Sequence, residues 1–240
     1  MEGFDMRLLL HFLFFSSFLF SYVINIPEDA ETIQEGIEEA ETGDTVLIAP
    51  GVYYEHLLLE KEIVLAGHAI YDDLETDWVN NENIQQTIIS GAEEPEDPSK
   101  GSCLIVRDGN IAPTILGLTF QSGKGTAMKM TACGKTLRER SGGAILLFKA
   151  YPTIMYNHFI NNGTSQVGGG NAGGAAVANG GAISHYDTDD VEFDEDRNNS
   201  GQGTTVDFSD MDAVRAYILE NDQNTDGSNS TRDRPATIII

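Results

Sequence analysis

The fold of this chain is decided by residues 32–67, which read TIQEGIEEAETGDTVLIAPGVYYEHLLLEKEIVLAG. Thr32 and Glu35 have the spacing of a capping box, in which each side chain satisfies a backbone N–H group at the start of a helix. Apolar residues then recur at the helical period, namely Ile33, Ile37 and Ala40. Gly43 follows, and glycine is the residue with which helices commonly end. The stretch therefore predicts one short helix that leads directly into strands.

Short apolar strands follow this helix and are separated by polar or glycine-containing corners. The strand-like runs are residues 45–49, 57–59, 63–65 and 87–91. Pro50-Gly51 and the charged residues 60–62 form corners between them. Strands of this length are too short for an open α/β sheet, and no second helix is predicted to cover them.

This segment resembles the N-terminal cap and first coils of the pectin-lyase-like right-handed parallel β-helix proteins. In that family a TIQ-x-(A/G)-I helix plugs the end of the solenoid, and a GDTV…PG-x-Y-x-E coil follows it. The resemblance extends over residues 23–193. It implies an all-β fold, a right-handed parallel β-helix or solenoid with an N-terminal α-helical cap. It implies no particular activity, because one fold hosts many unrelated functions.

An internal repeat also favours a solenoid. The recurring segments are PTILGLTF at residues 113–120 with PTIMYNHF at 152–159, and GGAI at 142–145 and at 180–183. Self-similarity at a fixed period is typical of architectures in which each unit buries its apolar face against its neighbours. The repeat predicts that Phe120 stacks on Phe159, and that Ile115 stacks on Ile154. Nearby asparagines are expected to bond to neighbouring backbone at a corner, namely Asn157, Asn161 and Asn162.

The composition is strongly acidic, with 38 Asp and Glu against 14 Lys and Arg and a net charge of −24. Nucleic-acid binding is therefore disfavoured, because it depends on Lys and Arg that displace counterions from phosphates. An acidic surface is compatible with divalent cations, a saline habitat or simply high solubility.

The N-terminus has the features of an export signal. Residues 8–20 form an apolar stretch with the length of a signal-peptide core, too short to span a bilayer. Glu2 and Asp5 are unusual in a signal peptide, which normally begins with positive charge. If translation began at Met6, the signal peptide would consist of Met6, Arg7 and the apolar core, which is the normal arrangement. We expect a signal peptide over residues 1–21, one β-helix domain over residues 22–240, and a secreted or cell-surface location without a transmembrane segment. The alternative is an apolar edge segment of the fold.

Two other expectations concern the cysteines and the C-terminus. Cys103 and Cys133 are candidates for a disulfide if the compartment is oxidising. The alternative is two free thiols in the core, where cysteine behaves as a small apolar residue.

The domain is expected to be incomplete at its C-terminus, because residues 236–240 are an apolar run without a polar cap after them.

Five basic residues concentrate in the segment that interrupts the repeat at residues 122–141. They are Lys124, Lys129, Lys135, Arg138 and Arg140, and Glu139 is the single acid among them. On an otherwise negative protein this loop favours a polysaccharide or cell-surface glycan of the uronate or sulfated kind, bound with an affinity that salt weakens. A second interrupting segment, residues 163–181, is uncharged and glycine-rich. The alternative is that both segments are solvent-exposed loops without a binding function.

A polar segment near the C-terminus has the oxygen-ligand spacing of a calcium loop. Its candidate ligands are Asp222, Asn224, Asp226, Ser228 and Asp233. It resembles EF-hand and dockerin loops, but Asn229 replaces the usual apolar anchor and Pro235 precedes a β-like tail. Calcium is the one cofactor that the sequence suggests, and a polar turn without metal is the alternative.

No complete catalytic motif is present, so no catalytic residue is assigned. Asn224-Thr-Asp-Gly227 resembles a tetrapeptide of polygalacturonase-type glycoside hydrolases, but the rest of that family's set is missing. The segment after Leu118-Thr-Phe-Gln121 lacks the motifs of pectinesterases, which share the opening PG-x-Y-x-E pattern. The carboxylates of residues 187–196 lie in sequence, which is typical of a solvated acidic edge strand.

We therefore predict a secreted or cell-surface protein that binds polysaccharide without evident catalysis. Two alternatives stay open. The first is a polysaccharide lyase or glycoside hydrolase whose remaining motifs lie beyond this chain, and it requires carboxylates that converge on one groove. The second is a structural adhesin stalk, which requires neither a groove nor an aromatic or basic face.

Overall fold

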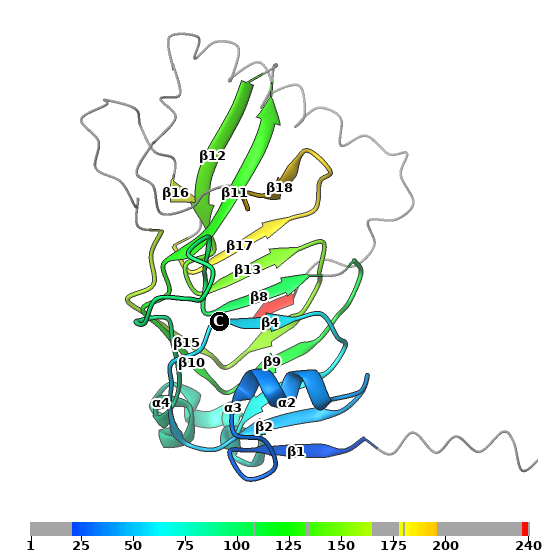
Figure 1. The fold of residues 1–240 in the computed structure, drawn as a ribbon. Helices are drawn as coiled ribbons and strands as arrows, with labels where there is room; N and C mark the ends of the chain where they lie inside the picture. Colours follow the sequence, from blue (N-terminus) through cyan, green and yellow to red (C-terminus); the bar gives the residue numbers. More distant parts are fainter. Residues whose placement is uncertain are drawn as a thin grey trace, which may run out of the picture.

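The computed structural model describes residues 21–107, 109–132, 135–164, 178–179, 181–195 and 237–239. In these residues the strands form four sheets, three of parallel strands and one built mainly of antiparallel pairs. The parallel sheets enclose one apolar core. The antiparallel hairpin projects from the end of the molecule opposite the first helix (Figure 1).

The three parallel sheets are named A, B and C here. Sheet A has the order β1 (Val23–Ile26), β2 (Thr45–Ile48), β5 (Val64–Gly67), β9 (Thr114–Leu116), β14 (Thr153–Met155) and β19 (Thr237–Ile239). Sheet B has the order β3 (Gly51–Tyr53), β6 (Thr87–Ser90), β10 (Thr119–Gln121) and β15 (His158–Ile160). Sheet C has the order β4 (Leu57–Leu59), β8 (Leu104–Arg107), β13 (Ile145–Phe148) and β17 (Ile183–Tyr186).

The fourth sheet, sheet D, contains the hairpin. Its order is β16 (Ala178–Asn179), β12 (Lys135–Ser141), β11 (Gly125–Ala132) and β18 (Val191–Phe193), and β7 (Lys100–Gly101) also pairs with β11. The pairs of β11 with β12, β18 and β7 are antiparallel, and only β12 with β16 is parallel. Sheet D packs on sheet C through an apolar cluster of Ile105, Met128, Leu146 and Val191.

The prediction of a single all-β parallel β-helix over residues 22–240 is wrong. The described strands lie in separate parallel and antiparallel sheets, and the β11–β12 hairpin has its own ladder from Thr126↔Ser141 to Ala132↔Lys135. Residues 68–86 fold into short helices, although no helix was predicted in this segment. Both segments leave the path of the parallel strands because local hydrogen bonds satisfy their backbone groups.

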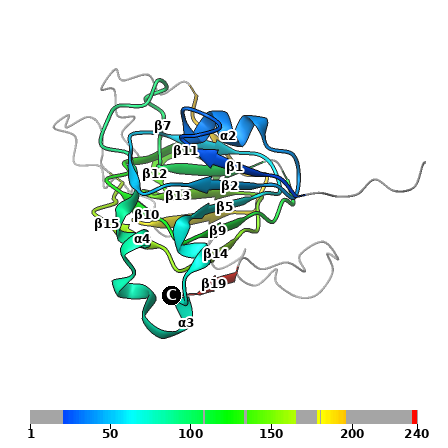
Figure 2. The ribbon, with the colours of Figure 1, turned by 90° about the horizontal axis from the view of Figure 1, so that it is seen from below.

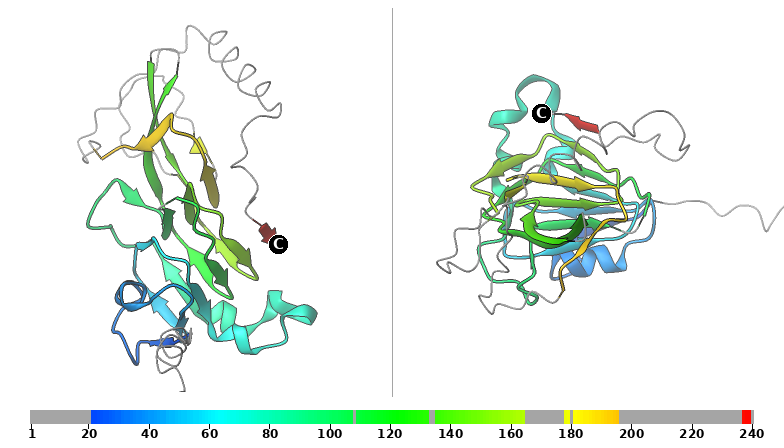
Figure 3. Two further views of the ribbon diagram at one scale, coloured as in Figure 1. Left: turned by 90° about the vertical axis from the view of Figure 1, so that its right-hand side faces the viewer. Right: turned by 90° about the horizontal axis from the view of Figure 1, so that it is seen from above.

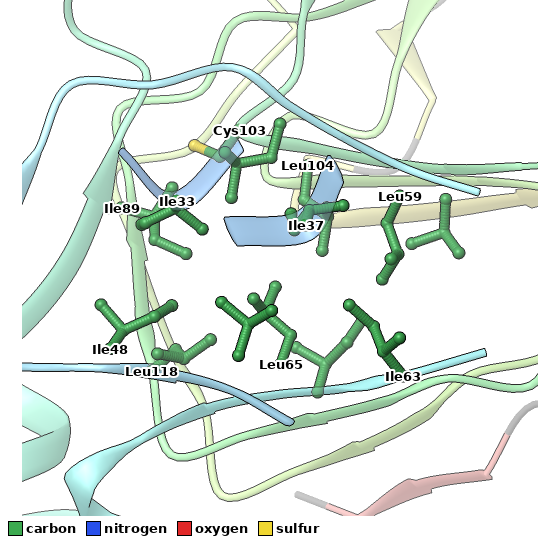
Figure 4. Close-up of a cluster of buried hydrophobic side chains, with 14 of the residues drawn as sticks. Ile33, Ile37, Ile48, Leu59, Ile63, Leu65, Ile89, Cys103, Leu104 and Leu118 are labelled. Carbon is green, nitrogen blue, oxygen red and sulfur yellow. The ribbon is translucent and has the colours of Figure 1, made fainter. Parts of the chain in front are cut away.

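The helix α2 (Ile33–Glu39) confirms the predicted helix at the N-terminal segment, but it ends at the C-cap Ala40 and not at Gly43. Thr32 Oγ1 accepts from Glu35 N at 3.1 Å, and Glu35 Oε2 accepts from Thr32 N at 3.1 Å, which completes the capping box. Ile33 and Ile37 are buried against the core. Figure 4 shows both side chains, which come from α2, among the core residues of the parallel sheets.

Side chains from the following strands hold α2 in place. Glu55 accepts from the backbone N–H groups of Ile33 and Gln34 at 3.0 Å each, at the positive end of the helix dipole. Lys61 Nζ donates to the carbonyl groups of Ile37, Glu38 and Ala40 at the other end. The Gln34 amide bonds to both backbone groups of Leu58, so it pairs with the edge of β4 as a strand would.

The register of the parallel sheets confirms the stacking that the repeat predicted. Phe120 pairs with Phe159, and the two rings are stacked with centroids 5.7 Å apart. Ile115 pairs with Ile154 in sheet A. Each fully buried side chain of this size contributes about 1.5–3 kcal/mol, and Phe120 is completely buried.

Two of the three corner asparagines bond to backbone as predicted. Asn157 accepts from Leu118 N at 3.0 Å and donates to Ile115 O at 2.9 Å. Asn162 accepts from Gly123 N at 2.9 Å and donates to Phe120 O at 2.8 Å. Each amide therefore joins two adjacent turns of the chain.

Several predictions lie outside the described residues. These are the signal sequence at residues 1–20, the disulfide partner Cys133, most of the glycine-rich segment, and the calcium-loop candidates Asp222, Asn224, Asp226, Ser228 and Asp233. They stay predictions.

Candidate functional site

The basic segment is a hairpin and not the loop that the sequence suggested. Lys129 lies on β11 opposite Arg138 on β12, and Lys135 lies on β12 opposite Ala132. Arg140 lies on the same strand opposite Ala127. The structure thus brings most of the predicted glycan-binding residues onto one sheet.

Three of the five basic side chains, those of Lys124, Lys129 and Arg140, are described and are engaged within the protein. Lys124 pairs with Glu94 at 2.6 Å, and this hydrogen bond lowers the pKa of the Glu94 carboxyl. Lys129 pairs with Glu192 at 3.5 Å. Arg140 is buried and donates to the carbonyl groups of Gly125 and Pro98 at 2.7 and 2.6 Å. These side chains offer an anionic glycan less free positive charge than the sequence suggested.

The acidic segment is largely the solvated edge strand that was predicted, since Asp187, Asp189, Asp190, Glu192 and Glu195 are all exposed, and Asp194 is the exception. Its strand β18 is the edge of sheet D, but Asp194 directly after it is fully buried and donates its backbone N–H to Ala127 O. Asp189 accepts a hydrogen bond from Lys149 within an ion pair. This bond lowers the pKa of the Asp189 carboxyl. Pairing with β11 explains the burial of Asp194, because the β11–β18 ladder continues into its backbone bond to Ala127.

A polar cluster joins the hairpin to sheet C. The Tyr186 hydroxyl donates to the Glu139 carboxylate, and Ser141 Oγ lies 2.5 Å from the Tyr186 hydroxyl oxygen and 3.2 Å from Glu139 Oε1, so its one proton serves one of these two acceptors. Ser184 Oγ accepts from Gly142 N at 3.0 Å. These groups satisfy one another, as buried polar groups must, so we interpret the cluster as a structural junction.

Cys103 lies in the core beside Asn162 and is a free thiol in this structure. Burial raises the pKa of its thiol to about 11. Because the thiolate is the reactive form, we expect Cys103 in a Cys133→Ser variant to resist alkylation at pH 8 until the protein is unfolded. Labelling followed by mass spectrometry checks this, and rapid labelling of the native variant would contradict the burial. In the unsubstituted protein, a loss of two mass units relative to the reduced form would instead establish the disulfide.

The helical insertion, residues 68–86, is a second candidate site. It comprises η1 (His68–Tyr71), α3 (Leu74–Asp77), η2 (Trp78–Asn80) and α4 (Glu82–Gln86). Figures 2 and 3 show that these short helices protrude from the side of the parallel sheets. The insertion is anchored by an apolar cluster of Ala66, Ala69, Leu74, Ile84 and Leu116.

Side-chain caps explain why this polar segment is helical. Asp73 accepts from Glu75 N at 3.1 Å at the start of α3. Asn81 accepts from Ile84 N at 3.0 Å at the start of α4. Both are residue types preferred at this position.

Aromatic side chains gather on the insertion and on the adjoining strands. The ring of Trp78 lies 5.9 Å from that of Tyr156 and 5.5 Å from that of His158, so η2 is held against the β14–β15 corner. Burial lowers the pKa of His158. Tyr71 is 73% exposed, and its ring meets His68 edge-on at 6.4 Å. Tyr71 therefore offers an aromatic ring to solvent.

Asp72, which follows Tyr71 in the sequence, has a carboxylate that is held in a fixed orientation. Asp72 Oδ2 accepts from the amides of Asn81 and Asn83, at 2.8 Å each. These bonds, first that of Asn81, lower the pKa of Asp72 and keep it ionised. The other oxygen, Oδ1, makes none of these bonds, so it is available as an acceptor.

Sequence reasoning missed the insertion as a site. The signal was present, since the only tryptophan of the chain lies among Asp72, Asp73, Asp77, Asn80, Asn81 and Asn83. The sequence did not show that these residues form one surface, because Tyr156 and His158, which contact Trp78, come from a distant part of the chain.

The described part of the chain shows neither a metal cluster nor a membrane-spanning helix. No group of three or more His, Cys, Asp or Glu side chains there could hold a metal ion. None of the helices in these ranges is long and apolar enough to span a membrane.

Comparison with known proteins gives no family assignment. No family model, no curated protein and no solved structure matches this chain. The function therefore has to be inferred from the arrangement of its side chains.

Proposed function

We propose that this protein is a secreted or cell-surface protein that binds polysaccharide without catalysis, through the helical insertion. The export part of the proposal rests on the apolar N-terminal stretch of the sequence. The binding part rests on one observation, which is the exposed ring of Tyr71 directly before the oriented carboxylate of Asp72.

This pair of groups suits the chemistry of a sugar ring. The C–H face of a pyranose is apolar and packs on an aromatic ring, while its hydroxyl groups donate hydrogen bonds. Aromatic side chains combine a large apolar surface with defined geometry. An ionised carboxylate accepts stronger hydrogen bonds than a neutral group does. The amides of Asn81 and Asn83 fix the carboxylate beforehand, so less freedom is lost on binding.

The absence of catalysis in this proposal rests on the sequence, in which no catalytic motif is complete, and Asp72 does not supply the missing acid. Hydrolysis of a glycosidic bond commonly needs one carboxylic acid whose pKa is raised, so that it can donate a proton near neutral pH. The pKa of Asp72 is instead lowered by its hydrogen bonds. Asp72 therefore suits a hydrogen-bond acceptor and not a general acid.

The Tyr71→Ala variant tests the proposed function. Its affinity for a bound polysaccharide should fall about tenfold, because stacking and area burial on an aromatic ring contribute about 1–2 kcal/mol. The measurement is isothermal titration or affinity electrophoresis with a panel of plant, algal and bacterial polysaccharides. The control is Tyr54→Ala, since Tyr54 is 54% exposed but follows β3, outside the insertion. Equal losses in both variants, or no binding to any member of the panel, would refute the proposal. Release of reducing or unsaturated ends would favour the lyase or hydrolase alternative.

A further inference from the structure

We infer that the polysaccharide bound at the helical insertion is neutral and is not a uronate or sulfated polymer. This inference rests on the proposed function and specifies its ligand. It reverses the expectation of an anionic glycan that the basic residues of the sequence suggested.

The first support is the charge of the insertion. Residues 62–99 contain no Lys or Arg, and the insertion contains five carboxylates, Asp72, Asp73, Glu75, Asp77 and Glu82. The lysines that flank this segment in sequence have other partners. Lys61 donates to three carbonyl groups at the end of α2, and Lys100 pairs with Asp97 at 3.2 Å. A polyanion approaching this surface meets repulsion over about 10 Å at moderate ionic strength.

The second support is the direction of the hydrogen bonds. Amide groups of the insertion donate inward: those of Asn81 and Asn83 to Asp72, that of Asn80 to Asp77, and that of Gln85 to Val79 O. Asp72 Oδ1 makes none of these bonds, and Asp72, Glu75 and Glu82 are exposed residues, so their carboxylates are available as acceptors. Such a surface presents ionised acceptors and has no Lys or Arg donor within the insertion. It therefore fits a ligand that donates through hydroxyl groups, whereas a carboxylate or sulfate ester needs donors.

The third support comes from the hairpin, the other place where an anionic glycan was expected. Lys124 and Lys129 form ion pairs with Glu94 and Glu192 there, and the Arg140 side chain is buried. An anionic polymer that used these three side chains would have to break the two ion pairs or expose Arg140.

Matched pairs of oligosaccharides test the inference on the full chain. One pair is an oligogalacturonide and the galacto-oligosaccharide made by reducing its carboxyl groups. The other is a gluco-oligosaccharide and its C6-oxidised uronate. Titration at low salt should show at least tenfold tighter binding of the neutral member of a pair, and Tyr71→Ala should weaken the binding of that member about tenfold. The difference in affinity between the neutral and the uronate member should decrease as the salt concentration rises, because screening reduces the repulsion.

Different outcomes separate this inference from the proposed function. Equal or tighter binding of a uronate, lost in Tyr71→Ala, would overturn the neutral ligand and leave the site standing. Binding of a uronate that survives Tyr71→Ala but is lost in Lys129→Glu would place the ligand on the hairpin and overturn both. Binding of neither member of either pair would overturn the inference, and failure of the broader panel as well would overturn the proposed function.

Discussion

Replacing Gly123 with alanine is expected to be among the most destabilising single changes in this protein. A Cβ atom at this position would lie 1.9 Å from the carbonyl oxygen of Gly143 and 2.9 Å from Cys103 Sγ. Neither a backbone carbonyl nor a buried thiol can move aside without displacing adjacent turns of the chain. We expect the free energy of unfolding to fall by about 3 kcal/mol or more, the upper range for overpacking.

Gly163→Ala is the matched control, because no atom lies within 4 Å of a Cβ placed at Gly163. Unfolding in urea, followed by circular dichroism, measures the difference between the two variants. If both melt like the unsubstituted protein, the close approach of Gly123 and Gly143 is not present in solution.

Replacing Ile37 with aspartate is expected to have a comparable effect by another mechanism. Ile37 is only 2% exposed and lies on the face of α2 that covers the core. The substitution buries a carboxylate without a partner, and we expect a loss of about 4 kcal/mol or more. Because a protonated carboxyl is less costly to bury, the loss should be smaller at acidic pH than at neutral pH.

Glu39→Asp controls for the helix itself, since Glu39 is exposed on α2 and the change keeps its charge. Thermal melts of both variants at neutral and acidic pH give the comparison. An Ile37→Asp protein as stable as Glu39→Asp would show that α2 is not docked on the core.

Features that depend on nearby residues could be predicted from the sequence. The capping box of Thr32 and Glu35 forms within one turn of helix, so its spacing alone was sufficient. The stacking of Phe120 on Phe159 followed from a repeat in which equivalent residues occupy equivalent places. The role of Gln34 was less visible, because its partner Leu58 belongs to a strand edge that exists only after folding.

The overall arrangement of the sheets could not be predicted in the same way. Residues 68–86 and the β11–β12 hairpin have local hydrogen-bonding solutions that compete with the winding of the parallel strands. The repeat carries no information about such insertions, so a single solenoid was expected where separate sheets occur. Likewise Arg140 was assigned to a glycan, although the carbonyl groups of Gly125 and Pro98 bind it in the folded protein.

By itself the sequence determined the helical cap, the short apolar strands and their register, because these depend on spacing within a turn or within a repeat. Only the tertiary structure decided which charges are free and which are used. It neutralised or buried Lys124, Lys129 and Arg140, and it brought Trp78 against Tyr156 and His158. The physical reason is that the energy of a charged or aromatic side chain is set by its partners in space, and these come from distant segments of the chain.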